Sequence, residues 1–274
     1  MSGAPFPPPT TPWREVDAAL RNHGLAVLDP AGLHARLDVE RGALDAWTPY
    51  WDRLTPDMHL RDGGAYRRRR HGSFIVEGDA VRAVPHRAHW QPLDYNALHG
   101  GIERWFEPLE EAFVAEPLWP RLLSMLGARA SALRGSQVAP EARSAPAPQG
   151  GVPALGRPGG GPWFVEAHPF RIDAAGGIGR PTPEGAHRDG VDLVAVMLVA
   201  RENVKGGESR VFAADGPAGQ RFTMTEPWTT LLLDDARVIH ETTPIQPLDP
   251  ARPSHRDTLV ITLRAAGFQD PPRA

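Results

Sequence analysis

The sequence predicts an α+β protein in which a helical N-terminal half packs around a β core in the C-terminal half. Apolar residues at helical spacing lie in the first 133 residues. From Trp163 onward, short apolar runs follow one another, separated by turns rich in Gly, Pro or Asp. Strands at this spacing indicate a β-sandwich or a small barrel.

One domain is expected over residues 13–265, because 274 residues suffice for one large domain. Residues 1–12 and 266–274 are expected to be tails, the first of them disordered. The domain would contain a helical part, a Pro/Gly-rich insertion and a β core, over 13–133, 134–162 and 163–265 respectively.

The N-terminal elements follow from apolar spacing and from the residues that interrupt it. The expected order is a helix over 13–23 that ends at Gly24, a short strand after it, a helix over 31–54, a strand over 66–76, and one or two helices over 100–127. Pro117 and Pro120 are expected to break the last segment, because proline removes a helical hydrogen bond.

The composition excludes several kinds of chemistry. The formal net charge of −3 gives no reason to expect nucleic acid or an anionic membrane as a partner. The chain has no cysteine, so any metal must be held by histidines and carboxylates. No run of 18 apolar residues predicts a membrane helix, and the N-terminus lacks the basic start of a secretory signal. A cytoplasmic location is therefore expected.

Four consecutive arginines, Arg67–Arg70, stand at the start of the expected strand over 66–76. Without a basic background they are weak evidence for nucleic-acid binding. Alternate residues of a strand share a face, so only some of them can point inward. One of them is expected to serve an internal acidic pair or a substrate carboxylate.

A possible metal site begins with His187 and Asp189, which follow a Pro/Gly turn and precede an apolar run. Side chains two apart on a strand share a face and can both reach one ion. His240 ends another strand-like run 53 residues later. Two histidines and one carboxylate are the ligands of non-haem Fe(II) oxygenases. A solvated turn with an incidental His and Asp remains an alternative, and a second such triplet, His255–Asp257, has no downstream histidine.

A candidate anion clamp opens the last strand. Arg256 and Thr258 share a face, and a guanidinium with a neighbouring hydroxyl can hold a carboxylate. Arg252 lies in a turn, and Arg264 lies about 27 Å farther along an ideal strand. A surface arginine at a strand edge is the alternative for Arg256.

Several segments together resemble the bacterial 2-oxoglutarate/Fe(II) dioxygenase family that includes the L-isoleucine 4-hydroxylases. The C-terminal segments are E-G-A-H-R-D-G-V-D-L-V, A-R-E-N-V-K-G-G-E-S-R, L-L-L-D-D-A-R-V-I-H-E-T-T-P-I and H-R-D-T-L-V-I-T. The N-terminal segments are Y-R-R-R-R-H-G-S-F and H-W-Q-P-L-D-Y-N-A-L-H-G-G-I-E-R-W-F-E-P-L. The resemblance covers most of residues 60–265.

The resemblance implies a double-stranded β-helix core of jelly-roll or cupin type, and an enzyme that uses Fe(II), 2-oxoglutarate and O₂. His187, Asp189 and His240 would hold the iron, and Arg256 would hold 2-oxoglutarate with the help of Thr258. The expected reaction is hydroxylation of an aliphatic C–H bond of a small substrate, with a free L-amino acid as the candidate. The sequence leaves a homo-oligomer open.

The expected substrate contacts come from the segment W-F-V-E-A-H-P-F-R-I, where Pro169 replaces the family's usual polar residue. By resemblance His168, Phe170 and Arg171 are pocket candidates, and Arg171 would supply a cation for the carboxylate of an amino acid. Two other functions remain open at this point. One is a zinc hydrolase that uses the same His/Asp/His set, and the other is a non-catalytic β-barrel binding module.

Overall fold

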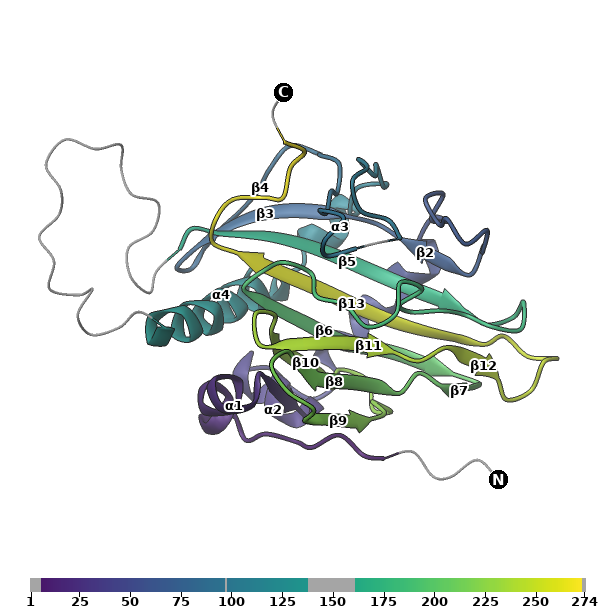
Figure 1. The fold of residues 1–274 in the computed structure, drawn as a ribbon, viewed down its shortest axis with the longest axis horizontal. Coiled ribbons are helices and arrows are strands. Elements are labelled where there is room, and N and C mark those ends of the chain that lie inside the picture. The colour runs from purple at the N-terminus through teal and green to yellow at the C-terminus, as the bar shows by residue number, and fades with distance from the viewer. Residues whose placement is uncertain (1–5, 97, 138–160, 273–274) are drawn as a thin grey trace, which may run out of the picture.

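A large antiparallel sheet forms the centre of the molecule (Figure 1). The structure is a computed structural model and describes residues 6–96, 98–137 and 161–272. The strand order in the large sheet is β1-β10-β6-β13-β5-β3-β4, with β2 paired to β5. The smaller sheets are β11-β8-β9 and β12-β7. The strands are β1 (Leu25–Leu28), β2 (Arg67–Arg69), β3 (Gly72–Glu77), β4 (Ala80–Ala83), β5 (Trp163–Asp173), β6 (Leu193–Glu202), β7 (Val204–Gly206), β8 (Ser209–Ala213), β9 (Gly219–Phe222), β10 (Thr230–Asp234), β11 (Val238–Thr242), β12 (Ile245–Pro247) and β13 (His255–Arg264).

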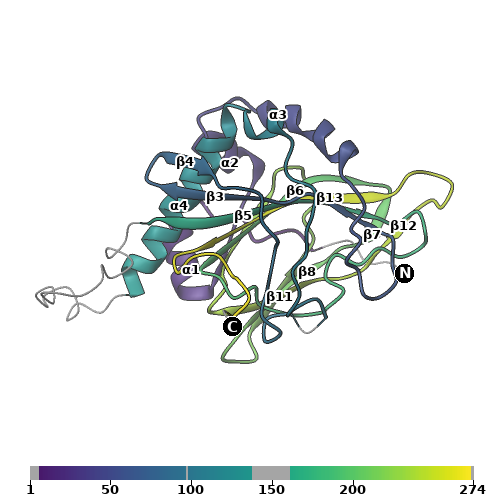
Figure 2. The same cartoon turned by 90° about the horizontal axis from the view of Figure 1, so that it is seen from above.

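The two faces of the large sheet have different neighbours. In Figure 2, α2, α3 and α4 lie along one face, and β8 and β11 lie on the other. The α-helices are α1 (Val16–His23), α2 (Pro30–Arg36), α3 (Glu111–Val114) and α4 (Leu118–Gln137), and 3₁₀ helices cover Trp13–Glu15 and Ala43–Arg53. Central strands are apolar on the helical face, as β13 shows with Leu259, Ile261 and Leu263 in the main core. The opposite face of β13 is therefore free to carry polar side chains.

Aromatic rings stabilise the helical face of the sheet. Trp47 is fully buried and packs edge-to-face against Phe113, Trp119 and Trp228, with centroid distances of 5.2, 6.0 and 6.0 Å. These contacts join the 3₁₀ helix Ala43–Arg53 to α3, α4 and the segment before β10. Such pairs contribute beyond the burial of their area.

Trp47→Ala is expected to lower the free energy of unfolding by about 3–5 kcal/mol, because it leaves a large cavity in this cluster. Denaturant unfolding measures the change. Trp105→Ala is the matched control, since Trp105 is 56% exposed and its loss is expected to cost below about 0.5 kcal/mol. Equal effects of the two substitutions would contradict this view of the core.

The first expected elements are largely confirmed. A 3₁₀ turn and α1 cover residues 13–23, and Gly24 ends the helix with φ +73° before β1. The expected helix over 31–54 is instead divided into α2 and the 3₁₀ helix Ala43–Arg53. The division follows from the left-handed backbone of Asp38 and Gly42, with φ of 51° and 89°. The expected strand over 66–76 is likewise two strands, β2 and β3.

The expectation of helix from residue 100 onward is wrong for its first part. Helix starts only with α3 at Glu111, and the segment before it is irregular. Gly101 there has φ +74°, which an α-helix does not accept. Pro117 does separate α3 from α4, as expected, but Pro120 does not break α4. Pro120 lies in the first turn, where its missing N–H group is not needed.

Both expected tails make ordered contacts where they are described. Thr10 forms a parallel bridge with Val27, and the N–H of Thr223 donates to the carbonyl of Phe6. At the other end, Gln269 is buried. Most of the Pro/Gly-rich insertion expected over 134–162 lies outside the described residues. Within the described part of the chain, no helix is long and apolar enough to cross a membrane.

Candidate active site

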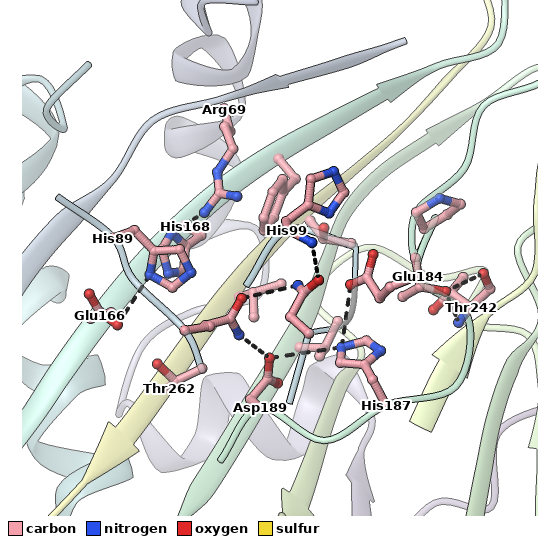
Figure 3. Close-up of a pocket in the computed structure, with 18 of the residues that line it drawn as sticks. Arg69, His89, His99, Glu166, His168, Glu184, His187, Asp189, Thr242 and Thr262 are labelled. Carbon is pink, nitrogen blue, oxygen red and sulfur yellow. Dashed lines mark hydrogen bonds and ion pairs between the residues drawn. The ribbon is translucent and has the colours of Figure 1, made fainter. Parts of the chain in front are cut away.

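His187, Asp189 and His240 come together between the large sheet and β11. The N–H of each histidine donates to the carbonyl of the other, at 3.0 and 2.9 Å, so the loop before β6 pairs with β11. Nε2 of His187 lies 3.8 Å from Oδ1 of Asp189, and Nε2 of His240 lies 3.7 Å from Oδ2. Figure 3 shows His187 and Asp189 pointing toward each other. The structure thus joins the three residues that the H-x-D…H spacing predicts.

The loop that carries Asp189 is held by a buried carboxylate. Asp235 accepts hydrogen bonds from the backbone N–H groups of Asp189, Gly190 and Val191, at 3.0, 2.7 and 3.1 Å. Gly190 has φ +75°, and a Cβ there would meet the ring of Tyr95 at 2.5 Å. The turn therefore requires a glycine directly after Asp189, and its hydrogen bonds hold Asp189 in one orientation.

The hydrogen bonding of His187 and the protonation state of His240 suit metal binding. Nδ1 of His187 lies 2.9 Å from the carbonyl oxygen of Gly185, so it can carry the proton and leave Nε2 free. Burial lowers the pKa of His187, but Asp189, Glu184 and the carbonyl of Gly185 together raise it above its usual value, so a bound metal ion would have to displace a proton from this ring. Burial and the adjacent His187 lower the pKa of His240 to about 3, which keeps this ring neutral. Metal ligands must be deprotonated, as His240 is here.

The donor set fits a metal ion. The candidate ligand atoms of His187, Asp189 and His240 all lie within 4.8 Å of one another. Ligands about 2.0–2.2 Å from one ion and at right angles lie about 3 Å apart, so small side-chain movements suffice. Two imidazoles and one carboxylate on one side leave further coordination positions open, the arrangement of non-haem Fe(II) oxygenases.

Arg256 and Thr258 line the same pocket from β13. Arg256 is 3% exposed, and its Nε and Nη2 have no hydrogen-bond partner within the described chain. Burial, and then the neighbouring Arg201, lower its pKa to about 10. A buried guanidinium with unused donors fits a carboxylate ligand, which would restore the lost interactions. The residues present therefore suit the distal carboxylate of 2-oxoglutarate.

Gln91 connects the metal site to the N-terminal half, and sequence reasoning gave it no role. Its Nε2 donates to Oδ1 of Asp189 at 3.3 Å, and its Oε1 accepts from Arg104 and Asn96 at 2.8 and 3.2 Å. Gln269 donates to the carbonyl oxygens of Asp189 and Gly190. In the sequence, the only indication of a role for Gln91 was that it belongs to the H-W-Q segment, one of the segments that resemble the dioxygenase family.

Gln91→Ala is expected to weaken metal binding about 10- to 100-fold, as the loss of a partner that orients a ligand usually does. Anaerobic calorimetric titration with Fe(II) measures this change. Gln220→Ala on the exposed part of β9 is the control and is expected to leave the affinity unchanged. If Gln91→Ala binds Fe(II) as tightly as the wild type does, Gln91 does not orient the metal ligand.

The three predicted substrate contacts divide between the two faces of β5. His168 and Phe170 line the pocket, but Arg171 does not. Arg171 donates twice to Asp257, at 2.8 and 2.7 Å, and pairs with Asp52 at 2.9 Å. Residues 168 and 170 share a strand face, and residue 171 must lie on the other. Arg171 is thus a structural ion-pair residue, which corrects the expectation of a substrate contact.

A second group of candidate ligands combines Glu166 and His168 of β5 with His71 and His89, which lie outside the strands. Glu166 lies 3.1 Å from Nε2 of His71, 3.3 Å from Nδ1 of His89 and 2.9 Å from Nη1 of Arg87. Burial lowers the pKa of His89 to about 3 and that of His168 well below its usual value. The single carboxylate is therefore already balanced by Arg87 among neutral rings, which leaves no net negative charge for a cation.

The His/Asp/His set and the buried arginine of this pocket indicate a metal-dependent oxygenase. Comparisons with known proteins support the same class. A profile of the 2OG-Fe dioxygenase family matches residues 48–262. The crystal structure of a bsmA homolog from Methylobium petroleophilum PM1 is 52% identical to the chain, with a TM-score of 0.82, and the match covers 96% of each chain. The chain therefore belongs to the 2OG-Fe dioxygenase family, whose members use Fe(II), 2-oxoglutarate and O₂.

More distant structures show the same fold. IDO from Bacillus thuringiensis is 16% identical, with a TM-score of 0.68, over 97% of this chain and 98% of that one. The Fe(II)/α-ketoglutarate-dependent dioxygenase TqaL is 18% identical, with a TM-score of 0.61, over 92% and 86%. The search of curated proteins finds no match. The expected α+β fold with a double-stranded β-helix core is confirmed.

Proposed function

We propose that this dioxygenase hydroxylates an aliphatic C–H bond of a small substrate, with a free L-amino acid as the substrate class. The main observation that supports this proposal is that His187, Asp189 and His240 line the same pocket as Arg256, whose Nε and Nη2 have no partner in the described chain. When bound, Fe(II), 2-oxoglutarate and O₂ supply the oxidising power, with succinate and CO₂ as the other products. The chain holds and orients these groups and excludes water.

Each residue of the set has a separate task in this proposal. His187, Asp189 and His240 hold the iron on one side, and Asp235 keeps the Asp189 loop in place through its three backbone hydrogen bonds. Arg256 and Thr258 bind the distal carboxylate of 2-oxoglutarate, which directs its other end toward the metal. The substrate then occupies the part of the pocket between the iron and β2.

An amino-acid substrate is supported by unpaired groups of both signs in one pocket. The buried Oε2 of Glu184 has no hydrogen-bond partner within the described chain and could accept an ammonium group. Buried arginine donors line the same space and could bind a carboxylate. The motif resemblance to the L-isoleucine 4-hydroxylases points to the same class. The cytoplasmic location and a homo-oligomer stay predictions.

The two alternatives are not favoured. A zinc hydrolase leaves the unpaired donors of Arg256 without a function. A binding module without turnover would have no need for open metal positions next to a carboxylate clamp. Membership of the dioxygenase family supports the oxygenase over both.

Succinate formation under air tests the proposal, with Fe(II)-reconstituted protein, 2-oxoglutarate and a panel of free L-amino acids. One amino acid is expected to stimulate succinate formation and to gain one oxygen atom by mass spectrometry. The blank is His187→Ala. Stimulation only by compounds that are not amino acids would refute the substrate class but keep the oxygenase.

A further inference from the structure

Three buried arginines gather on the N-terminal side of the active-site pocket, away from the clamp on β13. Arg67 and Arg69 come from β2, and Arg104 comes from the segment before α3. All three line the pocket, and each is at most 5% exposed. Arg67 has a counter-ion, because its Nε lies 2.7 Å from the buried carboxylate of Asp57. The described chain supplies no such ion pair to Arg69 or Arg104.

Arg69 is held in place by uncharged partners. Its guanidinium lies 3.9 Å from the ring centroid of Phe106 and 4.3 Å from that of Phe170. Its Nη2 lies 2.6 Å from Nδ1 of His168, a ring that burial keeps neutral. Its Nε has no partner among the described residues. The direct contacts of Arg69 are thus uncharged, and the attraction of Asp57 and Glu166 compensates its buried charge only in part, because burial still lowers its pKa well below the usual value.

Arg104 has a similar arrangement. Its Nη2 donates to the neutral amide of Gln91 at 2.8 Å, and its Nε has no partner in the described chain. Burial, and then the nearby Arg67, lower its pKa to about 10. Gln91 also donates to Asp189, so this guanidinium is two hydrogen bonds from a proposed metal ligand.

Among the described residues no carboxylate forms a direct ion pair with Arg69 or Arg104, although Asp57 and Glu166 raise the pKa of each of these arginines. Glu166 pairs with Arg87 at 2.9 Å, and Asp57 pairs with Arg67. Asp189 is a proposed ligand of the iron, and Glu184 lies next to His187, with Oε1 at 3.6 Å from its Nε2. Buried cations without a counter-ion are strongly unfavourable unless a ligand supplies the opposite charge. The arginine pair therefore fits an anionic group of a ligand.

This position differs from that of the 2-oxoglutarate clamp. In the sheet register, Arg69 pairs with Phe170 of β5, and Phe170 pairs with Thr258 of β13. Two strand spacings, roughly 10 Å, therefore separate Arg69 from Thr258. In Figure 3, Arg69 and His168 lie apart from the group of Glu184, His187 and Asp189. A ligand on Arg69 can approach the metal side of the pocket without occupying the clamp.

We propose that Arg69 and Arg104 form a second anion-binding site, which holds the carboxylate of the substrate while Arg256 holds that of 2-oxoglutarate. This proposal rests on the proposed function, which places a substrate near the iron. The second site restricts the substrates to carboxylates. Arg69 and Arg104, rather than Arg171, then determine which substrates bind. Amines and amides of the same shape are excluded because they leave both guanidinium groups without a counter-ion.

The test is calorimetric titration of protein loaded with Mn(II) and 2-oxoglutarate, which does not turn over. The probes are the free L-amino acids, 4-methylpentanoate, its amide, 3-methylbutylamine and inorganic phosphate. At least one carboxylate probe is expected to bind, and the amide and the amine are expected to bind at least about 10-fold more weakly. Arg69→Gln and Arg104→Gln are each expected to weaken carboxylate binding about 10- to 100-fold.

The controls separate this proposal from failures of folding or of cofactor binding. Arg68→Gln changes the exposed neighbour on the other face of β2 and is expected to bind the carboxylate normally. Arg69→Lys keeps the charge and is expected to restore part of the affinity lost in Arg69→Gln, which distinguishes charge from fold. The affinity for 2-oxoglutarate is expected to stay within about twofold in every variant.

Several outcomes would overturn the second site. These are no binding of any carboxylate by loaded wild-type protein, tighter binding of phosphate or of the amide, or unchanged carboxylate affinity in both glutamine variants. Failure of the proposed function would give a different result: the wild-type protein would then not bind 2-oxoglutarate in the presence of the metal.

Discussion

Asp189→Ala is expected to abolish iron-dependent 2-oxoglutarate turnover and to weaken Fe(II) binding by more than about 100-fold. The substitution removes the carboxylate that lies 3.8 Å from His187 and 3.7 Å from His240. Loss of a residue that only supports a ligand usually costs 10- to 100-fold in metal affinity, so loss of the ligand itself should exceed that range. Anaerobic Fe(II) titration and succinate formation measure the two effects.

The chain contains a matched control for this experiment. His255 and Asp257 form the second His-Arg-Asp triplet, but Asp257 points to Arg171 on the other face of the sheet. His255→Ala is therefore expected to leave Fe(II) affinity and succinate formation near the wild-type values. Metal binding that survives in Asp189→Ala, or that is lost equally in His255→Ala, would contradict the assignment of the ligands.

Arg256→Gln is expected to raise the dissociation constant of 2-oxoglutarate by at least about 30-fold while Fe(II) binding persists. Removing one partner of a buried charge pair costs about 2–5 kcal/mol, and each 1.4 kcal/mol is a factor of ten. The effect should be large because Arg256 is almost fully buried and its Nε and Nη2 lack partners in the described chain. Titration of 2-oxoglutarate into Fe(II)-loaded protein without oxygen measures it.

Arg252→Gln is the control for the clamp. Arg252 is exposed in the turn before β13 and does not line the pocket. Its substitution should change the affinity for 2-oxoglutarate less than about twofold. If both variants bind 2-oxoglutarate as tightly as the wild type does, another residue holds the distal carboxylate.

The two-residue spacing in the sequence predicted both the metal set and the clamp, but strand periodicity explains only the clamp. Arg256 and Thr258 lie on β13, whereas His187 and Asp189 lie in the loop before β6. His187 and Asp189 are two residues apart, and so are Arg256 and Thr258, and each pair shares a side in the structure. The same rule, applied to β5, would have placed Arg171 on the face opposite His168. Its assignment to the substrate relied on the family resemblance and on its charge, and its partner in the structure, Asp257, lies 86 residues away.

Sequence patterns missed the residues that reach the pocket from irregular segments. Gln91 and Arg104 lie in the stretch between β4 and α3, where no regular period relates position to direction. Gln269 lies beyond β13 in a segment expected to be a tail. Gln91 and Gln269 make long-range contacts with Asp189, and Arg104 is linked to it through Gln91; local spacing does not encode these contacts. The arginine run was a partial signal, since alternate residues Arg67 and Arg69 do point inward.

The most direct test of the account is anaerobic titration of 2-oxoglutarate into the wild-type protein, with and without Fe(II). The account predicts saturable binding to one site that requires Fe(II), because the clamp at Arg256 and the metal at His187, Asp189 and His240 act on the same molecule. Binding that is equally tight without a metal would contradict the joint site. No binding in the presence of Fe(II) would contradict the oxygenase itself.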